Sequence, residues 1–235
     1  MYDIIVKGGR ILDGTENPWF YGDIDIKNGK ISRIGKLRSD MTEKVIDARG
    51  YIVSPGFIDM HSHSDFAPLI NPYMESKVRQ GVTTEVIGNC GFSAAPLNDF
   101  LREQILETSP MLREANVKLE WASMAEYIET IQQNGVSLNL APLVGHGTLR
   151  AFVMGYEKRR PTSDELEEMK HLLAESLEQG AFGMSTGLIY PPSCYAETEE
   201  IIELCRIVAE YGGIYASHIR GEDYRLLDSV REAIE

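Results

Sequence analysis

Two histidines, His61 and His63, lie two residues apart at the end of an apolar stretch that begins near Tyr51. Side chains two residues apart on a β-strand point to the same face, so the two imidazoles would project together from the strand end. Neutral imidazole is a common ligand of zinc and related metals, so the pattern indicates a metal site. The simpler alternative is a pair of polar residues facing water. Asp59 and Asp65 flank the pair, and we interpret them as carboxylates that orient the imidazoles.

Further residues with metal-binding chemistry follow other predicted strands. Apolar strand patterns cover residues 52–63, 83–89, 138–144, 183–186 and 213–218. Cys90, His146 and His218 follow the second, third and fifth of these patterns. Because functional groups of parallel α/β folds gather at the carboxyl ends of the strands, we expect Cys90, His218 and the two earlier histidines to converge. This convergence favours a metal site, although an inert buried thiol is the alternative for Cys90.

Three residues are candidates for contacting a substrate, namely His146, Tyr190 and Arg220. His146 stands between two glycines and could instead hold a turn, which is the interpretation that we favour. Arg220 lies two residues before Glu222, so an ion pair between them is the favoured alternative to binding an anionic substrate group. The remaining histidine, His171, falls on the predicted solvent face of a helix.

Strand patterns alternate with helix patterns after residue 50. The helix patterns cover residues 74–80, 98–107, 124–133, 163–179, 198–211 and 224–235. The fourth is the clearest, since Thr162 and Glu165 are spaced as a capping box and Gly180 as a C-cap. The alternation predicts repeated βα units and a parallel sheet.

Residues 2–47 show a different pattern, of short strands that alternate apolar and polar residues. The strands are predicted at residues 3–7, 9–12, 22–27 and 30–34. Asn28-Gly29 separates the last two and is a strong signal for a two-residue hairpin turn. This part of the chain therefore predicts a small antiparallel sheet.

Composition limits the class of partner and the compartment. The 235 residues carry a formal net charge of -13, which argues against nucleic acid and anionic membranes as partners. No apolar run approaches the roughly 18 residues of a membrane helix, and no secretory signal is visible. The sequence contains three cysteines, Cys90, Cys194 and Cys205. Because this number is small and odd, a disulfide framework is not expected. We therefore expect a cytoplasmic protein.

The number of predicted strands indicates that the sequence is the N-terminal part of something longer. Five βα strands are predicted, whereas a closed (β/α)8 barrel needs eight. The last helix pattern also reaches Glu235 without a glycine, asparagine or proline to stop it.

Several segments resemble a known family. Residues 55–63, Pro-Gly-Phe-Ile-Asp-Met-His-Ser-His, resemble the first-strand signature of the amidohydrolase superfamily. Residues 81–91, 143–148, 183–192 and 215–220 resemble its D-aminoacylase (N-acyl-D-amino-acid deacylase) branch, and Gly-Asn-Cys90-Gly is the most specific element. The resemblance implies an α/β fold: part of a small β-sandwich over residues 1–50, then the N-terminal part of a metal-dependent hydrolase barrel over residues 51–235.

The resemblance also implies a reaction and a set of ligands. Cys90 and His218 would hold a tightly bound Zn²⁺, and His61 and His63 would belong to a second, weaker metal position. The substrate would be an N-acyl-D-amino acid, whose amide bond is hydrolysed by a metal-activated water. A further histidine ligand and the general-base aspartate would lie beyond Glu235, so we expect residues 1–235 alone to be inactive.

Two alternatives remain open. One is hydrolysis of cyclic amides, as in hydantoinases and dihydropyrimidinases. That activity would call for a lysine at the end of the fourth strand, where Ser185-Thr186 stands. The other is a non-catalytic fragment or homologue. The sequence does not indicate an oligomeric state.

Overall fold

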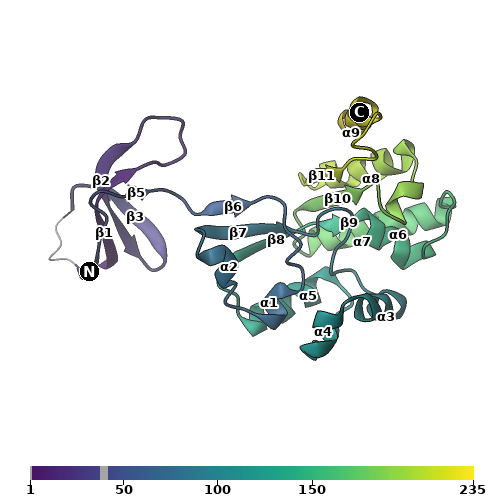
Figure 1. The fold of residues 1–235 in the computed structure, drawn as a ribbon, viewed down its shortest axis with the longest axis horizontal. Coiled ribbons are helices and arrows are strands. Elements are labelled where there is room, and N and C mark those ends of the chain that lie inside the picture. The colour runs from purple at the N-terminus through teal and green to yellow at the C-terminus, as the bar shows by residue number, and fades with distance from the viewer. Residues whose placement is uncertain (1, 38–41) are drawn as a thin grey trace. The chain divides into compact units, whose positions relative to one another are not determined.

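The structure is a computed structural model that describes residues 2–37 and 42–235. The chain divides into two compact units, Met1–Gly56 and Phe57–Glu235 (Figure 1). Among the described residues, no helix combines the length and the apolar character needed to cross a membrane.

The first unit is a five-stranded sheet. Its strands are β1 (Tyr2–Ile11), β2 (Phe20–Lys27), β3 (Lys30–Gly35), β4 (Thr42–Asp47) and β5 (Ile52–Val53). The order is β3-β2-β1-β4, with β5 also paired to β1. The hairpin at Asn28-Gly29 is confirmed, and both residues have positive φ angles. The sheet is mixed rather than antiparallel, because β4 and β5 both run parallel to β1.

The second unit alternates strands and helices. Its strands are β6 (Phe57–Asp59), β7 (Val82–Ile87), β8 (Asn139–Pro142), β9 (Val144–Gly145), β10 (Gly183–Gly187) and β11 (Ile214–His218). Its helices are α1 (Ala67–Ile70), α2 (Glu75–Val78), α3 (Asp99–Thr108), α4 (Pro110–Glu114), α5 (Met124–Asn134), α6 (His146–Met154), α7 (Ser163–Glu178), η2 (Ser193–Tyr195), α8 (Thr198–Glu210) and α9 (Leu226–Ile234). The predicted mixed α/β class is therefore confirmed.

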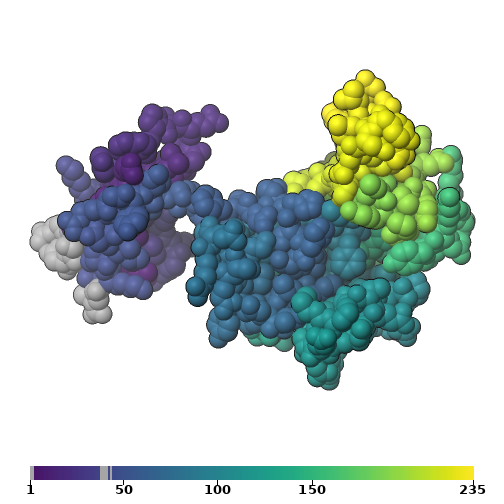
Figure 2. All heavy atoms as spheres, in the orientation of Figure 1, coloured from purple at the N-terminus to yellow at the C-terminus, as the bar shows by residue number. Residues whose placement is uncertain are grey.

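The strands of this unit form two parallel sheets of three, in the orders β6-β7-β8 and β11-β10-β9. Figure 1 shows α6, α7 and α8 beside the second sheet, and α9 projects from this unit in yellow in Figure 2. Within residues 2–37 and 42–235 the strands do not close into a barrel.

The structure adds a helix that the sequence pattern did not predict. Residues 146–154 form α6 directly after β9, and most of its side chains are buried. An almost fully buried helix has no polar face, so it lacks the periodicity on which the helix predictions depend. By contrast, the capping box of α7 at Thr162 and Glu165 is confirmed.

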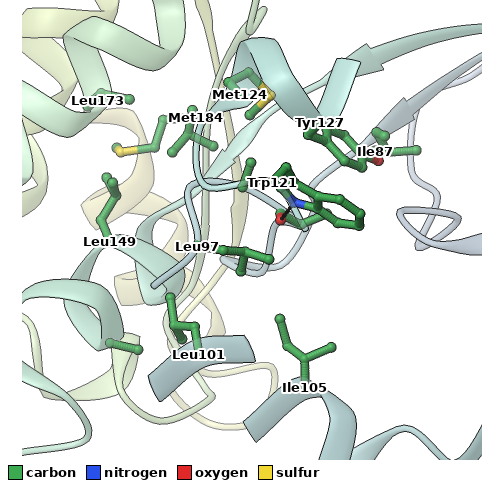
Figure 3. Packing of buried hydrophobic residues seen from close by; sticks show 14 of the residues in the cluster. Ile87, Leu97, Leu101, Ile105, Trp121, Met124, Tyr127, Leu149, Leu173 and Met184 are labelled. Carbon is green, nitrogen blue, oxygen red and sulfur yellow. Dashed lines mark hydrogen bonds between the residues drawn. The ribbon is translucent and has the colours of Figure 1, made fainter. Parts of the chain in front are cut away.

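The main core lies between these helices and the strands. Figure 3 shows Trp121 beside Tyr127, with Leu149, Leu173 and Met184 in the same cluster. The Trp121 indole N–H donates to the Ala94 carbonyl at 2.7 Å, so the large ring is buried without an unpaired donor. This core fixes the positions of the loops that follow β7, β10 and β11 and of helix α6, which follows β9.

Candidate metal centre

His61 and His63 lie in an irregular segment rather than on a strand. The prediction of one strand over residues 52–63 is wrong, because Pro55-Gly56 separates β5 from β6, and β6 ends at Asp59. A backbone hydrogen bond from Ser62 N–H to Val86 O, at 3.1 Å, joins this segment to β7. The two imidazole rings still lie close together, with centroids 5.3 Å apart.

Cys90 lies in the loop after β7, and its backbone is left-handed, with a φ of 55°. This conformation is uncommon outside glycine and costs on the order of 1 kcal/mol. The loop is fixed by β10. The Gly91 N–H donates to Ser185 Oγ at 3.0 Å, and a Cβ on Gly187 would lie 2.0 Å from the Cys90 carbonyl oxygen. The close contact therefore requires glycine at position 187 and holds the thiol in place.

His218 is the last residue of β11. Its Nε2 lies 3.3 Å from a carboxylate oxygen of Glu222 but does not form a hydrogen bond with it. The Tyr190 ring packs edge-on against the imidazole, with centroids 4.9 Å apart. These two neighbours limit the orientation of the His218 ring.

The three imidazoles surround the Cys90 sulfur. His61 Nε2 lies 3.3 Å from Cys90 Sγ, and His218 Nδ1 lies 3.5 Å from it. Ligand atoms of His61, His63 and Cys90 all lie within 4.8 Å of one another. Two ligands at zinc distances of about 2.3 Å for sulfur and 2.0 Å for nitrogen, set at a tetrahedral angle, would be about 3.5 Å apart. The donor types and their spacing therefore fit zinc.

The protein alone favours the uncharged forms of Cys90 and His63. Burial, followed by the negative charge of Glu222, raises the pKa of the Cys90 thiol. Burial, followed by the charges of His61 and His218, lowers the pKa of His63. Neutral imidazole is already the metal-binding form, whereas the thiol needs a nearby cation to become a thiolate.

A cavity of about 380 Å³ lies next to the centre. His63, Cys90 and Tyr190 contribute to its wall, and Leu101 and Ile105 of α3 supply part of its apolar surface. None of the described residues that line it is a lysine, arginine, aspartate or glutamate. The cavity therefore suits an uncharged group.

His146 is the first residue of α6 and is fully buried. Its Nδ1 lies 3.0 Å from Ser193 Oγ, and its Nε2 lies 2.8 Å from Glu200 Oε1. Arg150 Nη1 also pairs with Glu200, at 2.5 Å. Both ring nitrogens of His146 thus have protein partners, which agrees better with a positional role than with substrate contact.

Arg220 does not pair with Glu222, so that prediction is wrong. Its guanidinium pairs with Glu232 of α9, at 2.8 Å from Nη2, and also donates to the carbonyls of Cys194 and Ala196. A carboxylate 12 residues away prevails because α9 brings it next to the guanidinium, whereas Glu222 lies beside His218. In this conformation Arg220 connects α9 to the loop after Tyr190. The Tyr190 side chain is half exposed and lies at the cavity wall.

Asp59 and Asp65 do not orient the imidazoles as predicted. Within the described residues, neither carboxylate has a hydrogen bond to a histidine ring. Asp59 Oδ2 pairs with Lys77 Nζ at 2.6 Å, and Asp59 Oδ1 accepts the backbone N–H of His61 at 3.2 Å. Asp65 is buried, and burial raises its pKa to about 7. The departure of this segment from the strand explains the difference.

Sequence reasoning missed Lys77 and Glu85, which lie under the histidine segment. Glu85 is fully buried on β7 and pairs with Lys77 at 2.7 Å. A glutamate inside an apolar strand is a signal that could have identified it, because such residues are almost never buried without a partner. Lys77, on the short helix α2, gives no comparable signal.

Comparison with known proteins gives a consistent set of relatives. The chain is 38% identical over 231 residues to the D-aminoacylase of Alcaligenes xylosoxydans xylosoxydans, covering 98% of this chain and 47% of the relative. It is 40% identical over 233 residues to the N-acyl-D-aspartate deacylase of the same organism, covering 99% and 46%. The chain thus spans about half the length of the curated relatives that it matches.

Solved structures agree with these relatives. The crystal structure of N-acyl-D-glutamate deacylase from Bordetella bronchiseptica, complexed with zinc and a phosphonate inhibitor, superposes with a TM-score of 0.88 at 36% identity, covering 99% of this chain and 48% of that one. A D-hydantoinase shares only the fold, with a TM-score of 0.55 at 22% identity. The sequence profile of the amidohydrolase family matches residues 44–213, so this chain belongs to the amidohydrolase family.

Proposed function

We propose that this chain carries the metal centre of a zinc-dependent hydrolase that cleaves the amide bond of N-acyl-D-amino acids. The observation that carries the proposal is the pair of imidazole nitrogens 3.3 and 3.5 Å from the Cys90 sulfur. The D-aminoacylase, the N-acyl-D-aspartate deacylase and the N-acyl-D-glutamate deacylase described above support the substrate class. The distant likeness to a hydantoinase gives no support to a cyclic amide as substrate.

Each residue of the centre has a proposed role. Cys90 and His218 hold the tightly bound zinc, and His61 and His63 serve the second, weaker position. When bound, zinc lowers the pKa of a coordinated water from about 15.7 to about 7 and polarises the scissile carbonyl. Glu222 orients the imidazole of His218 by its charge. The proposal places the general-base aspartate and a further histidine ligand outside residues 1–235.

In this proposal the side chain of the substrate occupies the cavity beside the centre. Tyr190 supplies an aromatic contact at its wall, while His146 and Arg220 keep their carboxylate partners and position the surrounding loops. We also assign residues 1–50 to part of a small β-sandwich and residues 51–235 to the first part of a (β/α)8 barrel. The superposition on about half of a deacylase chain supports this assignment. We place the protein in the cytoplasm, since its three cysteines are free thiols.

The test is zinc content and hydrolysis of N-acetyl-D-leucine by the whole protein. We expect Cys90→Ala to lose the tightly bound zinc and to reduce kcat/KM by at least about 1000-fold, because the thiolate ligand is removed. Cys205→Ala is the matched control, because this thiol packs against the core away from the centre. Full activity of Cys90→Ala, or hydrolysis of the L-enantiomer at the same rate, would contradict the proposal.

A further inference from the structure

The segment that carries His61 and His63 is held mainly by side chains. It lies outside the sheet, and on its N-terminal side the Asp59 carboxylate accepts the His61 backbone N–H at 3.2 Å. The other oxygen of Asp59 lies 2.6 Å from Lys77 Nζ. The position of the His61 backbone is therefore coupled to the position of the lysine.

The serines that alternate with the histidines are held by a second carboxylate. Ser62 and Ser64 donate to Glu85 Oε1, at 2.9 and 3.3 Å. The same oxygen lies 2.7 Å from Lys77 Nζ. Lys77 thus bridges two carboxylates, one before the histidine pair and one beneath it.

The burial of this network makes the lysine important. The Glu85 side chain has no exposed surface, while 26% of the Lys77 side chain is exposed. Among the described residues, Lys77 is the only cation paired with Glu85. Removing one member of a buried ion pair leaves an uncompensated charge, so Glu85 would shift toward water and carry the two serines with it.

We propose that Lys77 is a positioning residue for the second metal position. By bridging Asp59 and Glu85 it keeps His61 and His63 turned toward Cys90, and its loss weakens metal binding at these histidines more than at Cys90 and His218. This inference rests on the metal centre proposed above, but its test separates the two.

The experiment measures zinc binding by the unchanged whole protein and by three variants of it, Lys77→Met, Lys77→Arg and Lys170→Met. Lys170 is a matched control, because it also bridges two carboxylates, Glu167 and Glu203, each at 2.9 Å, with 19% of its side chain exposed. We expect Lys77→Met to bind the second zinc equivalent about 10- to 100-fold more weakly, as changes behind metal ligands typically do. The first equivalent should be unchanged, Lys77→Arg should recover part of the loss, and Lys170→Met should bind both equivalents as the unchanged protein does.

A second measurement does not depend on metal. Hydrogen exchange of the Ser62 amide reports whether the segment leaves β7, because this amide donates to Val86 O. We expect faster exchange in metal-free Lys77→Met than in metal-free Lys170→Met. If Lys77→Met binds both equivalents as tightly as the control and its Ser62 amide exchanges no faster, the inference is overturned.

Two further outcomes are also decisive. If Lys77→Met does not fold, Asp59→Asn replaces it, since this carboxylate is 30% exposed and its loss leaves the buried pair intact. Weaker binding of the second equivalent then supports the inference, and unchanged binding contradicts it. If the unchanged protein binds no zinc, the proposed function fails, and the Ser62 exchange rates alone decide the role of Lys77.

Discussion

At the scale of single residues, the position of the Cys90 thiol depends on the backbone around it, and that backbone leaves room only for glycine at position 187. Gly187 lies against the Cys90 carbonyl so closely that a Cβ would come within 2.0 Å of the oxygen and 2.7 Å of the carbon. Backbone atoms cannot move aside as the end of a flexible side chain can. A methyl group at position 187 would therefore displace the loop that holds the sulfur.

We predict that Gly187→Ala weakens zinc binding by at least tenfold and lowers the free energy of unfolding by about 1–3 kcal/mol, as overpacking does. Gly22→Ala is the control, because its new Cβ would come closest to the end of the Ile11 side chain, at 2.9 Å, rather than to backbone atoms. Zinc titration and urea unfolding of both variants test this. Equal zinc affinity in the two variants would show that β10 does not hold the loop.

At the scale of elements, a buried polar cluster joins α6, α8 and η2 beneath the centre. Burial lowers the pKa of His146. Burial alone would raise the pKa of Glu200, but hydrogen bonds from His146 and Arg150 and the charge of Arg150 together lower it. In the folded protein both groups therefore bind protons less readily than in the unfolded chain. Both make stability fall as the pH falls, His146 from about pH 6.5 and Glu200 below about pH 4.5.

We predict that His146→Gln reduces the decline in the free energy of unfolding between pH 8 and pH 5. In the unchanged protein the unfolded chain takes up a proton at His146 that the folded state does not bind, and glutamine removes this difference. His171→Gln, on the exposed face of α7, should leave the decline unchanged. Urea unfolding of the metal-free protein at several pH values measures the effect. An unaltered decline in His146→Gln would mean that this histidine titrates normally.

The elements also show which features a sequence pattern reveals. The hairpin at Asn28-Gly29 and the capping box at Thr162 could be predicted, because local hydrogen bonds and backbone preferences determine them. Helix α6 could not, because a helix buried on almost every side has no polar face. Pro55-Gly56 is a sequence signal for a strand break, but the apolar residues on either side of it led to the prediction of one continuous strand.

The candidate site follows the same division. His61, His63, Cys90 and His218 could be singled out because their residue types are rare and each lies at the end of a strand or within four residues after it. The partners that orient them could not, because Lys77, Glu85 and Glu222 are ordinary charged residues until the fold places them. Arg220 is an example, because its partner Glu232 comes from the last helix and local sequence spacing does not reveal the pair.

At the scale of the whole molecule, the shape and charge of the cavity bear on substrate choice. Its apolar wall of Leu101, Ile105 and Tyr156 lacks a lysine or arginine among the described residues. A side-chain carboxylate of the substrate that is desolvated there would have no cationic partner, which is costly. Identity to the relatives does not discriminate, because the D-aminoacylase and the N-acyl-D-aspartate deacylase match almost equally.

We predict that the whole protein prefers N-acetyl-D-leucine to N-acetyl-D-aspartate by at least about tenfold in kcat/KM, equivalent to about 1.4 kcal/mol. Gln104→Arg would add a cation to the cavity wall and should raise kcat/KM for the aspartate derivative. Steady-state kinetics with both substrates test this. A preference for the aspartate derivative in the unchanged protein would contradict it.

The left-handed backbone of Cys90 has a consequence for how this protein evolves. Glycine at this position would relieve the strain, on the order of 1 kcal/mol, while removing the sulfur. If the proposed hydrolysis were no longer under selection, replacing this cysteine with glycine would relieve the backbone strain, so stability and the proposed activity favour different residues at this position.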